Sequence, residues 1–371
     1  MKKRSSSQKI QRRTMKTKRA QESVTIGMDL GDRTSRYCML GSEGESLREG
    51  QVQTSKAGML EAFGSLGRAR IAIEVGTHSP WVSRLLGSLG HEIIVANPRQ
   101  VKLITESSRK DDRLDAQTLA RLARIDPQLL RPIQHRSETA QTALTVIRVR
   151  AALIGVGTSL VNTARGLAKA MGERLPKCDA DQMGVLRAES VPPKLRQLLE
   201  PLLKEVESLT EKIKDSDREI EQIARKEYPE TVLLQQVGGV GPLIALTFVL
   251  SIDDKNRFRR SRDVGCYVGL RPRRSDSGQR QPQLRITKEC DPYLRTMLVP
   301  GAHYILSRRG PDTDLKRWGL RLAERGGKRA KKKAVVAVAR KLSILLHRLW
   351  VTGEVYEPLR NLRDLRKESA A

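Results

Sequence analysis

The order of strands and helices predicted for the first third of the chain limits its fold more than any other feature. Apolar strand-like segments separated by short turns are predicted at 24–30, 36–40 and 45–54. Helices and strands then alternate: helices at 56–66, 80–89, 98–106 and 112–124, and strands at 70–75 and 92–96. Strands joined by tight turns pair antiparallel, whereas strands joined through helices pair parallel. The sequence therefore predicts a mixed sheet covered by helices.

Four acidic residues lie at the ends of these predicted elements. Asp29 lies near the end of the first strand and Glu74 near the end of the fourth, while Asp112 and Asp115 share one side of a helix's first turn. That side continues into an apolar stripe, so all four carboxylates are expected to face inward, where each needs a cation or a donor. Oxygen-only ligands predict Mg²⁺, with Mn²⁺ as the other possibility. This order of elements, with acids at these places, is that of an RNase H-like fold.

The charge of the chain points to a nucleic-acid partner. The 371 residues carry a net charge of +28, and only 3% are aromatic. Phosphate contacts by arginine and lysine are therefore expected to dominate over base stacking, and the basic segment 1–20 is expected to be a disordered phosphate-binding arm. The four cysteines are scattered, which predicts reduced thiols and no zinc site. No segment was apolar enough to predict a membrane span, so a cytoplasmic, nucleoid-associated bacterial protein is expected.

Residues 137–228 are predicted to be helical. After a helix at 142–170, leucine, valine and isoleucine recur between Leu195 and Ile213 at alternating spacings of four and three. This heptad pattern predicts a coiled coil. Pro201 lies inside it and is expected to kink or restart the helix. The pattern leaves two possibilities open, namely a dimerising arm or a hairpin with helix 142–170.

The C-terminal region has two glycine-bearing motifs. The turn at 237–242 resembles a helix-hairpin-helix element, in which the backbone amides around Gly239 and Gly241 would bind a phosphate. Further on, Ser275 and Ser277 lie in a glycine-bearing loop with four arginines: Arg271, Arg273, Arg274 and Arg280. Serines in polar loops are usually turn residues. Guanidinium groups around a hydroxyl nevertheless suit a phosphodiester, because they neutralise developing oxyanion charge.

A basic run precedes the last predicted helix, at 334–350. It contains the further predicted nucleic-acid-binding residues Lys328, Arg329, Lys331, Lys332 and Lys333. We expect this run to face phosphates.

Taken together, these motifs resemble the DEDD-type transposases, or recombinases, of the insertion-sequence 110 family. The resemblance covers residues from about 24 to 350. Its anchors, in chain order, are 26–29, 73–74, 112–116, 238–241, 269–273 with 277–278, and 293–295.

The resemblance implies a RuvC-like domain whose acidic tetrad is Asp29, Glu74, Asp112 and Asp115, and a C-terminal domain whose serine nucleophile is Ser277. Ser275 is the second choice for the nucleophile, and Asp111 is an extra acid beside the tetrad. The implied domains are a basic arm (1–20), the RuvC-like domain (21–136), a helical coiled-coil region (137–228), a mainly helical transposase domain (229–352) and a charged tail (353–371). The implied partners are donor and target DNA, a noncoding bridge RNA and further copies of the chain, up to a tetramer.

The expected activity is Mg²⁺-dependent DNA strand cleavage and exchange through a covalent phosphoserine link. One alternative is a structure-specific nuclease, similar to a Holliday-junction resolvase, that uses water as nucleophile. A second is an actin-like sugar kinase or ATPase, which the strand-turn containing Asp29 also fits. A third is a nonenzymatic nucleic-acid scaffold in which the acids are helix starts and salt-bridge partners.

Overall fold

The computed structural model describes residues 24–97, 111–176, 178, 182–183, 192–278, 280, 282, 284–289, 291–327 and 329–361. The predicted basic arm, the predicted helix 98–106, Lys328 and the end of the predicted tail lie outside the described residues. The chain divides into two compact units, residues 1–135 and 136–371.

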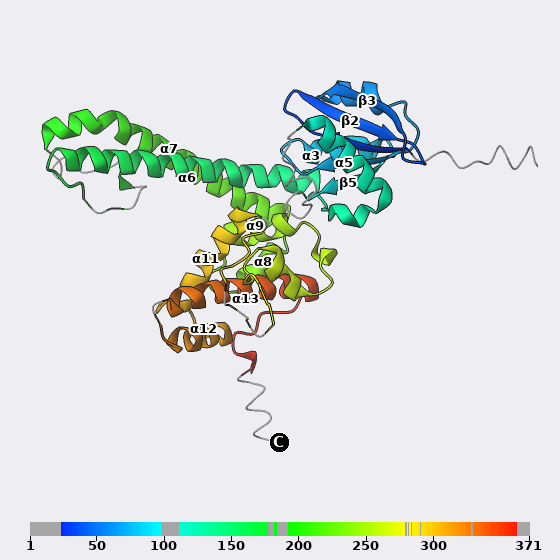
Figure 1. Cartoon of the computed structure of the whole chain (residues 1–371). Coiled ribbons are helices and arrows are strands. Elements are labelled where there is room, and N and C mark those ends of the chain that lie inside the picture. The colour runs from blue at the N-terminus through cyan, green and yellow to red at the C-terminus, as the bar shows by residue number, and fades with distance from the viewer. Residues whose placement is uncertain are drawn as a thin grey trace, which may run out of the picture. The chain divides into compact units, whose positions relative to one another are not determined.

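The first unit contains a mixed five-stranded sheet in the order β3-β2-β1-β4-β5 (Figure 1). Its strands are β1 (Thr25–Asp29), β2 (Thr34–Leu40), β3 (Ser46–Gln53), β4 (Arg70–Glu74) and β5 (Glu92–Ala96). The first three pair antiparallel, while β4 pairs parallel with both β1 and β5. The predicted mixed sheet is confirmed, and it is consistent with an RNase H-like domain.

Helices cover both faces of this sheet. On one face, Ile26, Met28 and Ile73 form a core with residues of α2 (Lys56–Phe63) and α3 (Ser79–Ser88). On the opposite face lies α5 (Asp112–Ile125), followed by the short helix η2 (Pro127–Leu130). The helix lies close to this face of the sheet. A Cβ atom on Gly27 would lie 2.1 Å from the Ala116 carbonyl oxygen of α5. The sheet therefore forms the middle of three layers.

Two long helices open the second unit. α6 (Glu138–Ala170) and α7 (Pro193–Lys226) lie side by side (Figure 1). Val161 and Ala164 of α6 pack with Leu199 of α7, and Arg150 binds Asp217. The chain thus forms the intramolecular hairpin that was one of the two possibilities. α7 also continues through Pro201, so the helix does not restart there.

By length and composition, α6 qualifies as a candidate membrane span. The prediction that no segment would do so was wrong. α6 qualifies because it has apolar residues on more than one face. A single helix of this kind is weak evidence for a membrane span.

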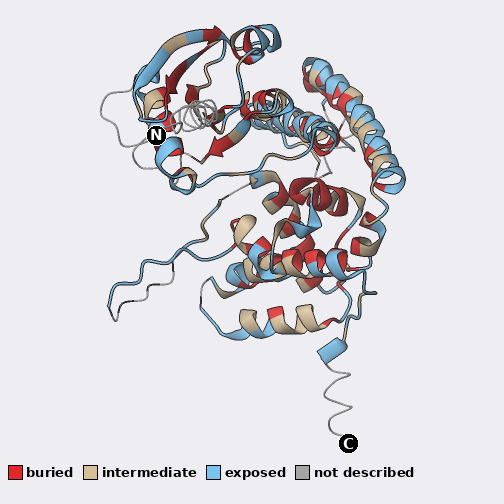
Figure 2. Ribbon diagram, turned by 90° about the vertical axis from the view of Figure 1, so that its right-hand side faces the viewer, coloured by how far each residue is buried: buried red, intermediate tan, exposed pale blue. Residues whose placement is uncertain are grey.

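The rest of the second unit is a helical body. It contains α8 (Thr231–Gln235), α9 (Pro242–Ile252), η5 (Lys255–Arg257), η6 (Ser261–Asp263), α10 (Val264–Tyr267), α11 (Pro292–Leu306), α12 (Asp314–Glu324) and α13 (Ala330–Thr352). α9 is apolar all round, and every residue from 245 to 252 is buried. Figure 2 shows the buried residues gathered in the sheet and in this helical body, while the long helices expose much of their surface.

Candidate functional site

The first unit places two predicted site residues at neighbouring strand ends. β1 and β4 are parallel, and the last register pair joins Met28 to Ile73. Asp29 and Glu74 each follow directly, so both lie at the carboxyl edge of the sheet. Because side chains alternate along a strand, Asp29 shares the face of Gly27, the face that carries α5.

The direction of α5 brings its acids to the same edge. The Arg70 guanidinium, at the start of β4, donates to the Ala123 carbonyl near the end of α5 at 3.2 Å. Gly27, in the middle of β1, contacts Ala116 and Ala120. The helix therefore runs antiparallel to β1, and its first turn lies toward the strand ends that carry Asp29 and Glu74. We call these four acids, Asp29, Glu74, Asp112 and Asp115, the acidic edge.

The burial of these acids differs from the sequence prediction. Asp29, Glu74 and Asp115 are half-buried, but Asp112 is exposed. The expectation that all four carboxylates face inward was therefore wrong for Asp112, because the first residue of α5 lies beyond the sheet that covers the rest of the helix. Asp111 is the N-cap of α5, and its carboxylate accepts the Arg113 amide at 3.0 Å. Asp111 is thus occupied in starting the helix, which favours Asp112 as the exposed ligand.

The acidic edge suits a hard divalent cation in its donor chemistry, since every candidate ligand is a carboxylate. Among the described residues, however, no three acidic, imidazole or thiol side chains lie close enough together to hold one ion. Two of the acids also lie in the first turn of a helix, where carboxylates are stabilised by the helix dipole without a metal. The donor type therefore fits Mg²⁺ or Mn²⁺, and the elements bring the donors to one edge.

Two polar clusters near this edge were missed by the sequence analysis. Glu49 of β3 accepts hydrogen bonds from Gln117 at 2.6 Å and Arg113 at 2.5 Å, and these contacts fix the start of α5 to the sheet. They also lower the pKa of the Glu49 carboxyl, with the Gln117 hydrogen bond as the largest cause. Nothing in the local sequence around Glu49 signals this role, because its partners lie more than sixty residues away.

The second cluster centres on His78, which follows Glu74 by four residues. Its Nδ1 accepts a hydrogen bond from the Trp81 indole at 3.1 Å, and its Nε2 lies 3.5 Å from the Asp32 carboxylate. Asp32 in turn follows Asp29 by three residues. The sequence could have revealed this cluster, because Asp32 and His78 each follow a strand-end acid within four residues.

In the second unit, Ser277 lies at the tip of an exposed hairpin. Its amide donates to the Arg280 carbonyl at 3.2 Å, and the Arg280 amide donates back to the Ser277 carbonyl at 3.0 Å. Gly278 has a φ of +53°, a conformation that tight hairpin turns require and that side chains rarely adopt. The sequence Ser-Gly is therefore what allows the turn to form, and it leaves the Ser277 hydroxyl on an exposed residue.

Arginines are spread along this hairpin. The predicted nucleic-acid-binding residues Arg271, Arg273, Arg274 and Arg280 are all exposed, as is Ser275. They belong to a hairpin held by backbone hydrogen bonds from Arg273 to Arg285 at 2.8 Å and from Thr287 to Arg271 at 2.9 Å. We call residues 269–289 the serine hairpin.

A single arginine closes the base of the serine hairpin. The Arg295 guanidinium of α11 donates to the Val268 carbonyl and to the Glu289 carbonyl, both at 3.0 Å. Gly269 has a φ of +66°, and a Cβ atom there would lie 2.4 Å from the Glu289 carbonyl oxygen. The two ends of the hairpin are thus drawn together where a side chain would not fit.

The α11 N-terminus is anchored beside this base. Asp291 caps the helix by accepting the Tyr293 amide, and its carboxylate binds Arg136 and Arg148 at 3.1 Å each. Arg148 lies in α6, so these ion pairs connect the start of α11 to the long helix pair. The Asp291 side chain is only 7% exposed, so it needs both cations.

The glycine-rich turn between α8 and α9 has a packing role. Gly239 has a φ of +88°, and a Cβ atom there would meet the Gly301 carbonyl oxygen of α11 at 2.9 Å. Gly241 is the N-cap of α9, is exposed and has open space around its Cα. Of the two predicted phosphate-binding glycines, only Gly241 is surrounded by the room that a ligand needs.

The basic run forms the start of α13. Arg329 is its N-cap, and Lys331, Lys332 and Lys333 are exposed in the first turn, where no acid is present. Cations at a helix N-terminus oppose the helix dipole. A bound anion would relieve that repulsion, which is consistent with the predicted phosphate contact.

Comparisons with known proteins identify the family of the chain. A family model for the DEDD transposases of IS110, described as "Transposase", matches residues 26–171, and a model described as "Transposase IS116/IS110/IS902 family" matches residues 232–316. The first match spans the acidic edge, and the second includes the serine hairpin.

Several relatives match most of the chain. The chain is 29% identical over 355 residues to the transposase for insertion sequence element IS1111A of Coxiella burnetii, which covers 92% of this chain and 93% of that protein. It is 28% identical over 314 residues to a "Probable family 20 transposase" of Pseudomonas aeruginosa (82% and 91%). It is 25% identical over 291 residues to the transposase for insertion sequence element IS1328 of Yersinia enterocolitica (76% and 84%). The chain belongs to the IS110 family of insertion-sequence transposases.

Proposed function

We propose that this protein is a transposase that cuts and exchanges DNA strands through a covalent link to Ser277. The observation that carries the proposal is the position of Ser277 at the exposed tip of an arginine-rich hairpin. An exposed hydroxyl next to several guanidinium groups can approach a phosphodiester, because the guanidinium groups offset the charge of both the DNA and the transition state.

The chemical step is a transesterification. The Ser277 Oγ attacks phosphorus, its proton leaves to a base, and a new P–Oγ bond forms. The P–O3′ bond of the DNA breaks, and the 3′ oxygen leaves with the electron pair and takes up a proton. Attack of a 3′-OH from another strand on the phosphoserine reverses these bond changes, reseals the DNA and regenerates Ser277. The covalent link conserves the energy of the phosphodiester, so no nucleotide cofactor is consumed.

The acidic edge is the proposed second half of the active site. These four acids are not gathered into one ion site among the described residues. If Asp29, Glu74, Asp112 and Asp115 were drawn together around Mg²⁺, the ion would polarise the phosphoryl oxygens and stabilise the leaving 3′ oxygen. Glu49 supports this role by holding the start of α5, and therefore Asp112 and Asp115, to the sheet. Donor and target DNA are the proposed substrates.

Two further parts of the proposal rest on the family resemblance. A noncoding bridge RNA would select donor and target sequences by base pairing, while the protein contacts its backbone. Four copies would assemble, and each active site would combine an acidic edge from one copy with a serine hairpin from another. The net charge of +28 provides for contacts to both nucleic acids.

A trapping assay tests this function. The protein is incubated with Mg²⁺, labelled element-junction and target DNA, and RNA transcribed from the noncoding end of the element, and the products are resolved on denaturing gels. We expect labelled DNA to migrate with the protein, to require the RNA, and to be absent with Ser277→Ala. The matched control is Ser275→Ala, which changes the neighbouring serine of the same hairpin and should retain the adduct.

The remaining outcomes separate the alternatives. An adduct that is retained in Ser277→Ala but lost in Ser275→Ala moves the nucleophile to the second choice. Cleaved DNA without any adduct replaces the proposal by a nuclease that uses water. An adduct that forms equally well without RNA removes the guide from the mechanism.

A further inference from the structure

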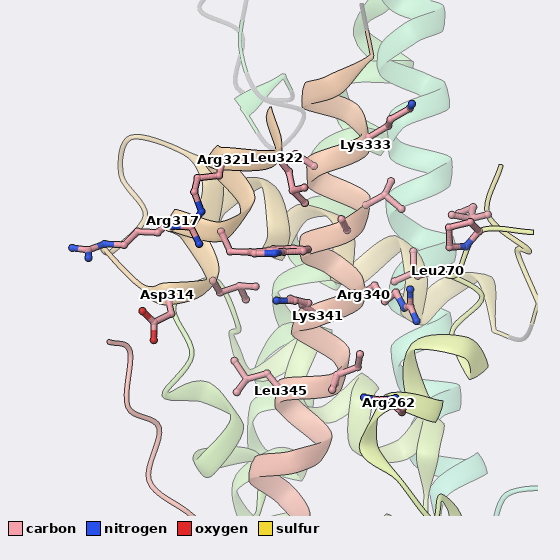
Figure 3. A pocket seen from close by; sticks show the side chains of 18 of the residues that line it. Arg262, Leu270, Asp314, Arg317, Arg321, Leu322, Lys333, Arg340, Lys341 and Leu345 are labelled. Atoms are coloured by element: carbon pink, nitrogen blue, oxygen red, sulfur yellow. The ribbon is translucent and has the colours of Figure 1, made fainter. Parts of the chain in front are cut away.

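A large groove lies in the C-terminal body, away from the tip of the serine hairpin. Its volume is about 2000 Å³, and its walls are formed by α12, α13, the base of the serine hairpin and residues 354–361 (Figure 3). Leu270 and Ile286 of the serine hairpin belong to its lining. The groove is therefore continuous with the segment that carries Ser277.

The walls of the groove are strongly cationic. They include Arg262, Arg321, Arg325, Lys332, Arg340 and Lys341, whereas the acids in the lining are Asp314, Glu354 and Glu357. Glu354 already binds Arg348 and Arg360. The groove thus has a surplus of positive charge that fits a polyanion.

Lys341 and Arg321 lie close together on one side of the groove. The Lys341 ammonium lies 3.8 Å from the centre of the Trp318 ring, and Figure 3 shows it directed from α13 toward α12. Burial and then the charge of Arg321 lower the pKa of Lys341. Two like charges beside an aromatic ring repel each other, and a phosphate between them would remove that cost.

Arg340 lies on the other side of α13, toward Leu270 and Arg262 (Figure 3). Its Nε is buried, and no acceptor within the described part of the chain is in hydrogen-bond reach. A buried donor without an acceptor is unfavourable, because it has lost its hydrogen bonds to water. An anionic ligand in the groove would supply the missing acceptor.

Part of the lining is apolar, and we call this part the floor of the groove. It includes Leu270, Leu322 and Leu345, together with the Trp318 ring. A duplex presents phosphates on its outside and would leave these residues uncovered. A single strand can place phosphates against the cationic walls and bases against an apolar floor.

We propose that this groove binds single-stranded nucleic acid, DNA or RNA, with its phosphates on Arg321, Arg340 and Lys341 and its bases on the apolar floor. The origin of the bound strand rests on the proposed function. It would be a DNA strand opened for recombination or an unpaired part of the guide RNA. Because the groove lies beside the base of the serine hairpin, it would hold that strand near the segment that carries Ser277.

The test measures binding apart from chemistry. Full-length Ser277→Ala protein, without divalent cations, is titrated against fluorescent 30-nucleotide thymidine and uridine strands and a 30-base-pair duplex, at several salt concentrations. The test variant adds Arg321→Gln and Lys341→Gln. The matched control adds Lys194→Gln and Arg196→Gln, which remove the same charge from exposed positions of α7.

We expect the groove variant to bind single strands about tenfold more weakly, with the slope of log K against log salt shallower by about 1.4, the value for two lost phosphate contacts. The control should stay within about twofold of the parent, since Lys194 and Arg196 lie outside the groove. A preference for the uridine or the thymidine strand identifies the source of the ligand, and either result supports the groove. Equal losses in variant and control, or an unchanged affinity in the groove variant, would overturn it.

A second measurement locates the strand and does not depend on the double variant folding. Strands that contain 5-iodouracil are cross-linked by light to the parent protein, and the modified peptides are sequenced. Cross-links within 315–345 support the proposal, whereas cross-links confined to other segments exclude it. Both measurements use protein that lacks Ser277 and report binding alone. A groove that does not bind single strands can therefore be distinguished from a failed trapping assay.

Discussion

Gly27 determines how closely α5 lies on the sheet. A Cβ atom at this position would lie 2.1 Å from the Ala116 carbonyl oxygen and 2.3 Å from the Ala120 amide nitrogen. Both contacts are backbone atoms of a helix, so they cannot move aside as a flexible side chain could. We predict that Gly27→Ala pushes α5 outward and destabilises the first unit by about 1–3 kcal/mol. Hydrogen exchange of the α5 amides measures the loss.

Gly87→Ala is the control for this prediction. Gly87 lies in α3, and the nearest atom to an added Cβ is the Ile93 Cγ1 at 3.9 Å. Alanine is favoured over glycine in helices, so exchange should be unchanged or slower. Equal protection of α5 in both variants would show that the close contact at Gly27 is not needed.

His347 makes the second unit sensitive to acid. It is 1% exposed, its Nε2 lies 2.9 Å from the Lys255 carbonyl and its Nδ1 lies 3.0 Å from the Ser261 hydroxyl. In a neutral ring, Nε2–H donates to the carbonyl and Nδ1 accepts from the hydroxyl. Burial lowers the pKa of His347 below its ordinary value, so the folded protein holds this ring in its neutral form.

The sign of the resulting pH dependence follows from proton binding. An unfolded histidine has a pKa of about 6.5, so below that pH the unfolded chain binds a proton that the folded chain binds less readily. Stability should therefore be level above about pH 7 and decrease from about pH 6.5 downward. Thermal melts of wild type and His347→Gln between pH 5 and 8 check this, and the variant should show a weaker dependence.

The exposed His303 of α11 provides the comparison for His347. His303→Gln should keep the full pH dependence of the wild type, because this variant leaves His347 and its two hydrogen-bond partners in place. A wild-type pH dependence in His347→Gln would assign the effect to other groups.

At the scale of elements, Arg295 controls the serine hairpin. Its two hydrogen bonds, to the carbonyls of Val268 and Glu289, join the ends of the hairpin. Under the proposed function, Arg295→Ala should lower the single-turnover rate of adduct formation about tenfold or more, because a misplaced Ser277 loses its alignment with phosphorus. DNA affinity should stay the same, and exchange of the hairpin amides should increase.

Two variants test this positioning role of Arg295. Arg295→Lys can keep one of the two hydrogen bonds and should give an intermediate rate. Arg309→Ala removes the same charge from an exposed loop and should leave the rate unchanged. If Arg295→Ala weakens DNA binding and leaves the rate at saturating DNA intact, Arg295 contacts DNA and does not position the hairpin.

The elements predicted from sequence agree with the structure where the signal was local. The boundaries of β5 were predicted at 92–96 as observed, and those of β1, β3 and β4 were within one residue. Two helices show the limits of such prediction. α12 was missed although Leu315, Trp318 and Leu322 recur along it at helical spacing, and α13 was expected to start at 334 but starts at Ala330. The start of α13 was missed because residues 331–333 are lysines and carry no apolar signal.

At the scale of the whole molecule, the outer face of α6 remains apolar. Val149, Val156 and Leu167 are each about half exposed and lie on one side of the helix with the half-buried Leu153, while Leu160 on the same side packs against the core between α6 and α7. This spacing suits a second pairing of the long helices, between copies of the chain. We predict that wild-type protein associates in sedimentation experiments and that Val156→Glu with Leu167→Glu weakens the association at least tenfold.

The matched control for this association is Thr158→Glu with Asn162→Glu. Both residues are exposed on α6 but lie off the apolar stripe, so this variant should associate as wild type does. A wild-type chain that stays monomeric at every concentration would leave the intramolecular hairpin as the whole role of the helix pair.

The sequence by itself determined the order of the five strands and of the described helices between them, the acids at the ends of β1 and β4, and the positive charge. Periodicity, turn residues and charge act locally or over the whole chain, so they can be recognised without coordinates. The same holds for the Ser277-Gly278 turn, because glycine marks a positive φ.

Only the tertiary structure determined which partners those elements pack against. It paired α7 with α6 of the same chain, left Asp112 exposed, used Asp111 as a cap, and placed Arg295 and Glu49 at their anchoring positions. It also gathered Arg321, Arg340 and Lys341 around one groove. These outcomes depend on contacts between residues far apart in the chain, and such contacts are set by packing rather than by local pattern.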